Sequence, residues 1–141
     1  MNKLLLALLM VSSSAFAASN TIYTTNGGYY AAMVKDDFDG STKCNVYNKD
    51  TNIIFRQNGE IQVYYKFRYF VPKSLWVKSD EAEPQFYSLT TKQTMSQTVL
   101  LPVKSNDKID RLRLRAMSPT YNSSEDDINL VEVREALSHC N

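Results

Sequence analysis

The feature that most restricts the fold is a hairpin pattern between Asn52 and Val71, in which Asn58-Gly59 separates two β-prone runs. Asn and Gly both tolerate the positive φ angles of a type I′ turn, and that turn suits a pair of twisted strands. After the turn, apolar and polar residues alternate with a period of two, which is typical of a strand with one buried face. The inward set is Ile61, Val63, Tyr65, Phe67, Tyr69 and Val71. We therefore predict a long hairpin strand in the middle of an antiparallel sheet.

The same hairpin predicts an apolar patch on its second face. With a two-residue turn, Ile54 pairs with Val63, and Ile53 lies opposite Tyr64 on the other side of the sheet. Ile53, Phe55 and Tyr64 then form an apolar contact patch that something must cover. We expect a C-terminal helix to cover it; if the patch is exposed, it becomes a candidate binding surface.

The rest of the chain predicts a mostly β fold. Short β-prone runs recur between turn signals, which favours an antiparallel β-sandwich or open barrel of about seven or eight strands. The clearest run is 111–117, where leucine and alanine alternate with arginine. Near the C-terminus, Ser124 and the acids after it are typical of a helix start, and a short helix is expected at least over 134–139. The segment 128–133 could instead be a last strand.

The first residues predict export. Lys3 precedes an apolar run from Leu4 to Val11, and Ala15-Phe16-Ala17 is typical of a signal-peptidase cleavage site. We predict a bacterial signal peptide over 1–17, cleaved after Ala17, and one β-rich domain over 18–141 in the periplasm or the medium. No later stretch is long and apolar enough to predict a membrane span.

The chain has two cysteines, Cys44 and Cys140. In an exported protein, a lone pair of cysteines predicts one disulfide bond. A reactive thiol pair is the alternative, but the spacing lacks the C-x-x-C form typical of redox sites.

Charged side chains suggest one binding surface. Lysine and arginine total 16 against 15 acidic residues, so net charge does not predict binding to nucleic acid. However, alternation places three arginines on one exposed strand face, and two further cations form a second stripe: Arg111, Arg113 and Arg115, with Lys66 and Arg68. Arginine binds carboxylate and phosphate in a forked geometry, so an acidic glycan, a lipid phosphate or an acidic protein face is a candidate partner. The alternative is a solvated strand face whose charges oppose aggregation.

Sites for metals, cofactors and catalysis are not predicted. A calcium loop counted from Asp37 would close at Asn48, which cannot supply the bidentate carboxylate, so a polar turn is favoured. His139 is the single histidine, which leaves no Ser-His-Asp or multi-histidine site. Glu81 and Glu83 could act on a glycoside, although a solvated acidic turn is the simpler interpretation.

These observations favour a non-enzymatic binding or interaction module that acts on a protein or an envelope component. The support is a predicted disulfide, a near-neutral charge and a surface rich in tyrosine, of which the chain has nine. An inhibitor or immunity-type protein that neutralises a periplasmic enzyme or toxin is the alternative. An envelope hydrolase is the third hypothesis.

Overall fold

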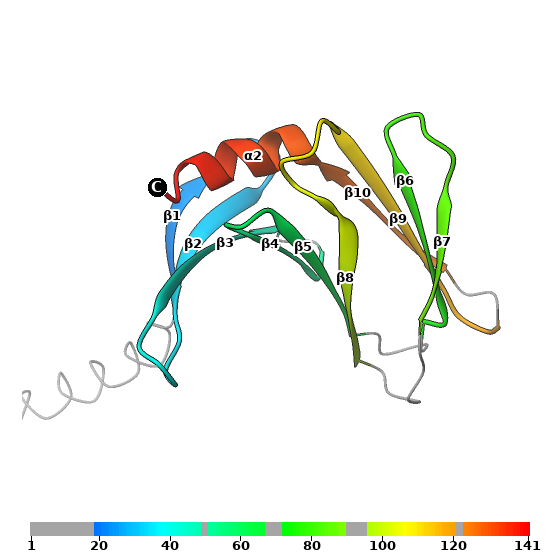
Figure 1. Cartoon of the computed structure of the whole chain (residues 1–141), viewed down its shortest axis with the longest axis horizontal. Helices are drawn as coiled ribbons and strands as arrows, with labels where there is room; N and C mark the ends of the chain where they lie inside the picture. The colour runs from blue at the N-terminus through cyan, green and yellow to red at the C-terminus, as the bar shows by residue number, and fades with distance from the viewer. Residues whose placement is uncertain (1–18, 49–50, 67–71, 90–95, 121–122) are drawn as a thin grey trace, which may run out of the picture.

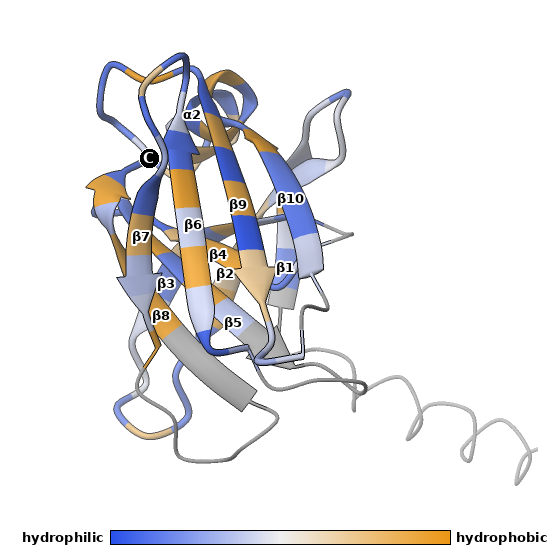
Figure 2. Ribbon diagram, turned by 90° about the vertical axis from the view of Figure 1, so that its right-hand side faces the viewer, coloured by the Kyte–Doolittle hydropathy of each residue, from blue (hydrophilic) through white to orange (hydrophobic). Residues whose placement is uncertain are grey.

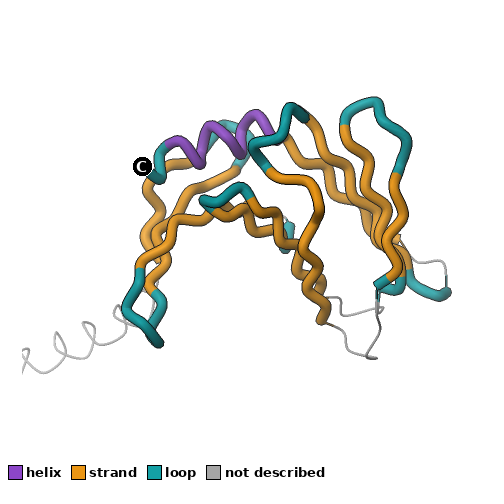
Figure 3. Tube along the Cα trace, in the orientation of Figure 1, coloured by secondary structure: helices purple, strands orange, loops and turns teal. Residues whose placement is uncertain are grey.

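Two antiparallel β-sheets and one C-terminal helix form the part of the chain described by the computed structural model (Figures 1 and 3). That part comprises residues 19–48, 51–66, 72–89, 96–120 and 123–141, so the predicted signal peptide lies outside it. The elements are β1 (Ser19–Thr24), β2 (Tyr29–Lys35), β3 (Thr42–Asn48), β4 (Ile53–Arg56), β5 (Glu60–Lys66), β6 (Ser74–Ser79), β7 (Gln85–Ser88), β8 (Ser96–Lys104), β9 (Arg111–Met117), β10 (Ser123–Asn129) and α2 (Leu130–Ser138). The predicted mostly β fold with a short C-terminal helix is confirmed, with ten strands rather than seven or eight.

The strands divide into a sheet of six and a sheet of four. The larger sheet has the order β1-β2-β3-β4-β5-β8, and the smaller one has the order β10-β9-β6-β7. Figure 2 shows the smaller sheet in front of the larger one, with α2 behind its upper end. The β4–β5 hairpin is flanked by β3 and β8, so its predicted place inside a sheet is confirmed.

The core lies between the two sheets and α2. Burial follows a period of two along β6 and β9, visible as alternating hydrophilic and hydrophobic bands in Figure 2. Along β9, Leu112, Leu114 and Ala116 are buried, whereas the three arginines that alternate with them are exposed, as predicted. The helix contributes Leu130 and Val133 and packs against β2, β3 and β9. Its contacts with both sheets close one end of the core.

The turn of the β4–β5 hairpin differs from the prediction. The amide N–H of Gly59 donates to the carbonyl of Arg56 at 2.8 Å, and Gly59 has a φ of +89°. This is a three-residue loop, a type I turn followed by a left-handed glycine, instead of a two-residue type I′ turn. The extra residue changes the register by one, so that Phe55 pairs with Ile61 and Ile53 pairs with Val63. A one-residue change moves every side chain of a strand to the opposite face.

The C-terminal segment is also divided differently from the prediction. Residues 123–129 form β10, and α2 is capped by Asn129 rather than by Ser124. The Asn129 side-chain oxygen accepts hydrogen bonds from the N–H groups of Val131 at 3.1 Å and Glu132 at 3.3 Å. The acids before the cap pair across the strands with arginines of β9, which stabilises a strand of low intrinsic β-propensity. The prediction also missed β1, which is short and polar.

A disulfide bond and several polar contacts attach the helix to the larger sheet. The predicted Cys44–Cys140 bond is confirmed, with Cα atoms 5.6 Å apart and a sequence separation of 96. The ring of Tyr23 stacks on His139 at a centroid distance of 3.6 Å, and the Tyr23 hydroxyl donates to Glu135 at 2.5 Å. The α2 end of the larger sheet is thus held both covalently and by hydrogen bonds. Within the described residues, no helix has the length and apolar character needed to cross a membrane.

Candidate functional site

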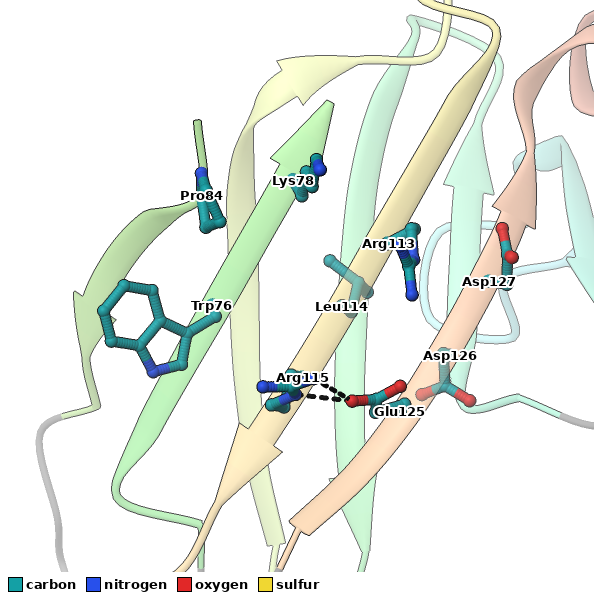
Figure 4. Close-up of a pocket in the computed structure, with 9 residues that line it drawn as sticks. All are labelled: Trp76, Lys78, Pro84, Arg113, Leu114, Arg115, Glu125, Asp126 and Asp127. Atoms are coloured by element: carbon teal, nitrogen blue, oxygen red, sulfur yellow. Dashed lines mark hydrogen bonds and ion pairs between the residues drawn. The ribbon is translucent and has the colours of Figure 1, made fainter. Parts of the chain in front are cut away.

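An open pocket of about 650 Å³ lies on the outer face of the four-stranded sheet (Figure 4). We call it the Trp76 pocket. Its lining comes from all four strands or their flanks: Trp76, Lys78, Pro84, Arg113, Leu114, Arg115, Glu125, Asp126 and Asp127. Strand alternation places Leu114 and Asp126 on the inner side of the sheet, so the exposed lining is aromatic and charged.

The strand register fixes two rows of side chains across the pocket. In the first row, Arg115 of β9 pairs with Trp76 of β6, which pairs with Phe86 of β7. In the second row, two residues along, Arg113 pairs with Lys78. The Trp76 and Phe86 rings meet nearly edge to face, with centroids 5.0 Å apart, yet these residues remain 37% and 54% exposed. An exposed aromatic pair therefore lies beside a cationic pair.

The predicted arginine stripe is present but partly neutralised. The Arg111 Nε atom donates to Asp127 Oδ1 at 2.8 Å, and two nitrogens of Arg115 donate to Glu125 Oε1. Arg113 lies between them and, among the described residues, has no carboxylate within ion-pair distance; the same holds for Lys78. Figure 4 shows the Arg115–Glu125 pair as the pocket's dashed contact. Asp127 lies directly opposite Arg113 in the strand register but pairs with Arg111, so Arg113 and Lys78 are the lining cations without an ion pair in the described chain.

Neighbouring acids of β10 have opposite electrostatic environments. Asp127 is exposed on the outer face, and the hydrogen bond from Arg111 lowers the pKa of this carboxyl. The same contact raises the pKa of Arg111. Asp126 points to the inner side, where burial raises the pKa of its carboxyl. Only the outward acids offset the charge of the arginine stripe.

The second predicted stripe does not join the first. Lys66 belongs to β5 in the six-stranded sheet, whereas the arginines belong to β9 in the four-stranded sheet. Arg68 lies outside the described residues. A single anion-binding surface built from all five cations is therefore not supported by the described chain.

The predicted apolar contact patch is not a single surface. Ile53 is 1% exposed and Phe55 is fully buried, because the three-residue hairpin loop turns both toward the core. Tyr64 is on the opposite face and is exposed. The two buried residues belong to the core cluster between the sheets, whereas the helix packs on β2, β3 and β9. The expectation of a patch that includes Tyr64 was wrong, since it depended on a two-residue turn.

A second exposed feature lies in the loop between β2 and β3. Phe38 is 99% exposed at this loop, which is ordered by local hydrogen bonds. The side chain of Asp36 accepts from the Phe38 N–H, and that of Asp39 accepts from the Ser41 N–H, each at 2.8 Å. Gly40 completes the turn with a φ of +71°. These contacts agree with the predicted polar turn, and no group of three potential metal ligands occurs among the described residues.

Sequence reasoning found the arginines but missed Trp76, Lys78 and Phe86 as site residues. The pocket depends on the pairing of β9 with β6 and of β6 with β7, and those pairs join segments far apart in sequence. An available signal was the alternation of Trp76 with buried Leu75 and Val77, which places the indole on an exposed face. A tryptophan on the polar side of a strand is uncommon enough to mark a candidate contact.

Comparison with protein-family models, curated proteins and solved structures finds no match to this chain. A function therefore has to be argued from the site itself. In the described residues, the Trp76 pocket combines concavity, exposed aromatic area and unpaired positive charge. That combination suits non-covalent recognition of a ligand that has both an apolar face and a negative group.

Proposed function

We propose that this chain is an exported bacterial binding module without catalytic activity, and that the Trp76 pocket is its binding site for a protein or envelope component. The observation that carries the proposal is the exposed aromatic residue beside two cations without carboxylate partners, within one pocket. An exposed aromatic and unpaired cations on a rigid sheet are the features of a recognition surface.

The charge pairing in this pocket differs from that of an ordinary charged strand face. On a solvated face that only opposes aggregation, charges of both signs pair or point into water. Here, two arginines of β9 have acidic partners on β10, while Arg113 and Lys78 face each other across β9 and β6. Two like charges directly opposite each other destabilise a sheet. Asp127, opposite Arg113 on its other side, offsets part of this cost, and an anionic ligand group would offset more of it.

The predicted export agrees with the covalent structure. A formed disulfide between Cys44 and Cys140 suits an oxidising compartment, such as the bacterial periplasm or the medium. The predicted signal peptide over 1–17 leads to the same compartments. An envelope component is then a natural ligand for the pocket.

The single tryptophan of the chain makes the proposal directly testable. Envelope fragments from a bacterial cell should change the emission of Trp76, because a ligand in the pocket changes the polarity around the indole. Arg113→Gln and Lys78→Gln should each weaken binding roughly tenfold, since each removes a charged contact. Lys43→Gln is the matched control because Lys43 is an exposed lysine on β3 in the other sheet. Unchanged emission, or equal binding by all variants, would refute the pocket as the site.

One observation favours the alternative, an inhibitor or immunity-type protein. An ordered loop that presents a fully exposed Phe38 has the form of an anchor for a pocket on a partner protein. If this function holds, the wild-type chain should retain one stoichiometric partner from periplasmic extract, and Phe38→Ser should lose it. Retention should survive Arg113→Gln. The reverse pattern, with loss only in Arg113→Gln, would support the Trp76 pocket instead.

A further inference from the structure

We propose that the Trp76 pocket binds a saccharide ring that carries a single carboxylate. This inference rests on the proposed function and names the ligand class of the same site. Three properties of the pocket lead to it: an aromatic platform, a cationic pair at a fixed offset, and an acidic rim. Each property excludes a different class of ligand.

The aromatic platform selects a ring with an apolar face. The indole of Trp76 is partly exposed, and Phe86 packs against it from β7 at an interplanar angle of 61°. This contact braces the indole and leaves it in reach of the pocket, where Figure 4 shows it across the sheet from the acids. Aromatic rings offer a rigid apolar surface at low entropic cost. The C–H face of a sugar ring is a matching surface, with hydroxyl groups at its edge.

The cationic pair selects one negative group near that ring. Lys78 and Arg113 occupy the next outward row from Trp76, so their Cα atoms lie roughly 6 to 7 Å farther along the strands. That offset places a carboxylate attached to a sugar ring between the two cations while the ring lies on the indole. A purely apolar ligand would instead remove water from both cations without offering them a partner, which is costly.

The acidic rim excludes polyanions. The outward-facing lining has three cationic residues, Lys78, Arg113 and Arg115, and two acidic residues, Glu125 and Asp127, since Asp126 points inward. Three positive charges against two negative ones leave a formal charge of only +1, and nucleic acid or an anionic lipid surface would meet repulsion from the outward carboxylates of β10. Those same carboxylates accept hydrogen bonds from hydroxyl groups. A polyhydroxylated ring with one carboxylate satisfies both sides of the pocket.

The test compares two probes that differ only at C6, where methyl β-D-glucuronide has a carboxylate and methyl β-D-glucoside has a neutral hydroxymethyl group. With one tryptophan in the chain, the indole N–H gives one resonance that reports on the pocket in a titration extending to high millimolar concentrations. The glucuronide should bind roughly tenfold more tightly than the glucoside. Arg113→Gln should remove this difference, and Lys43→Gln should keep it. Trp76→Ala, followed through backbone amides of β6 and β9, should weaken both probes.

The outcomes test the ligand class separately from the proposed binding function of the Trp76 pocket. Equal affinities for the two glycosides, or a difference that survives Arg113→Gln, would overturn the carboxylate assignment. Tighter binding of polyglutamate than of the glucuronide would overturn the saccharide assignment. If neither glycoside binds but envelope fragments still change Trp76 emission, the inference fails and the proposed function stands. If neither glycosides nor fragments act on Trp76, both fail. Near-UV circular dichroism confirms that each variant is folded.

Discussion

The aromatic and charged residues on the outer faces of the two sheets differ in how they are packed and paired. On the six-stranded sheet, Tyr30 and Tyr47 stack on each other with centroids 5.5 Å apart, and Asn45 donates to the Tyr47 hydroxyl at 3.2 Å. On the four-stranded sheet, Trp76 and Arg113 face an open pocket. The number of tyrosines therefore does not identify a binding surface in this chain. The two faces differ in whether these side chains are stacked or hydrogen-bonded to neighbours within the fold or are exposed in a pocket.

The inner faces differ as well, because the disulfide bond and most packing contacts of α2 are made with the larger sheet. Cys44 belongs to β3, and the helix packs on β2 and β3. The Trp76 pocket, by contrast, is formed by four strands whose outer side no described element covers. We therefore expect stability and binding to respond to different substitutions.

The largest effect should come from removing the disulfide. The double variant Cys44→Ala, Cys140→Ala opens a covalent loop whose ends have a sequence separation of 96. The chain-entropy model gives a loss of about 4 to 5 kcal/mol in the free energy of unfolding, as an upper value. Urea unfolding followed by Trp76 emission and by circular dichroism measures it. Below the unfolding transition, the double variant should retain the wild-type affinity for the glucuronide. Loss of that affinity in a folded variant would show that the pocket depends on the helix side.

How far the sequence could predict this fold depends on the segment. Strand β9 was predicted because leucine and arginine alternate without interruption, so burial and charge indicate the same face. The hairpin was placed in the right sheet position but with the wrong register, since Asn-Gly suits both a type I′ turn and a type I turn followed by a left-handed glycine. The pairing of Phe55 with Ile61 and the hydrogen bond from Gly59 to Arg56 separate these turns.

The candidate site was harder to predict than the strands. The segment with Glu125 and Asp127 is typical of both a helix start and a polar strand, and the choice depends on the arginines that it meets across β9. From sequence, three arginines were equivalent. The structure makes Arg113 distinct, because Arg111 and Arg115 form ion pairs, whereas Arg113 lies opposite Asp127 without forming one. Such partners come from strand register, which residue order alone does not specify.

A medium effect should come from Asp126, compared with its neighbour Asp127. Burial raises the pKa of Asp126, so the folded state binds its proton more tightly than the unfolded state does. Stability is then lost as the pH rises from the pKa of aspartate in the unfolded chain, about 3.9, through the raised pKa of Asp126 in the folded state. Asp126→Asn should stabilise the protein at pH 7 on the order of 1 kcal/mol, with the gain fading in acid.

Asp127 should show the opposite pH dependence. Its folded pKa is lowered by Arg111, so its stabilisation is present above the unfolded pKa and disappears as pH falls through the folded pKa. Asp127→Asn should therefore destabilise slightly at pH 7 and not in strong acid, with a small effect because the pair is exposed. Urea unfolding at pH 3 and pH 7 measures both variants. Parallel pH profiles for the two would contradict the inward and outward assignment.

The smallest effect should come from changing the charge of the rim. Glu125→Gln keeps an oxygen acceptor for a sugar hydroxyl but releases Arg115 from its ion pair. The glucuronide should then bind roughly two- to threefold more tightly at low salt, and less of this gain should remain at 0.15 M salt. Stability should hardly change, since the pair is exposed.

Glu60→Gln is the matched control for this change, because it weakens an exposed Glu–Arg contact with Arg56 on the six-stranded sheet. It should leave affinity for the glucuronide unaltered. If Glu125 sets the preference for a single negative charge, Glu125→Gln should raise the affinity for polyglutamate more than the affinity for the glucuronide. The reason is that the additional carboxylates of the polymer are no longer repelled by the Glu125 carboxylate. An equal gain for the two probes would instead mean that Glu125 only restrains Arg115. Selectivity against polyanions would then have to come from the remaining acid of the outer face, Asp127.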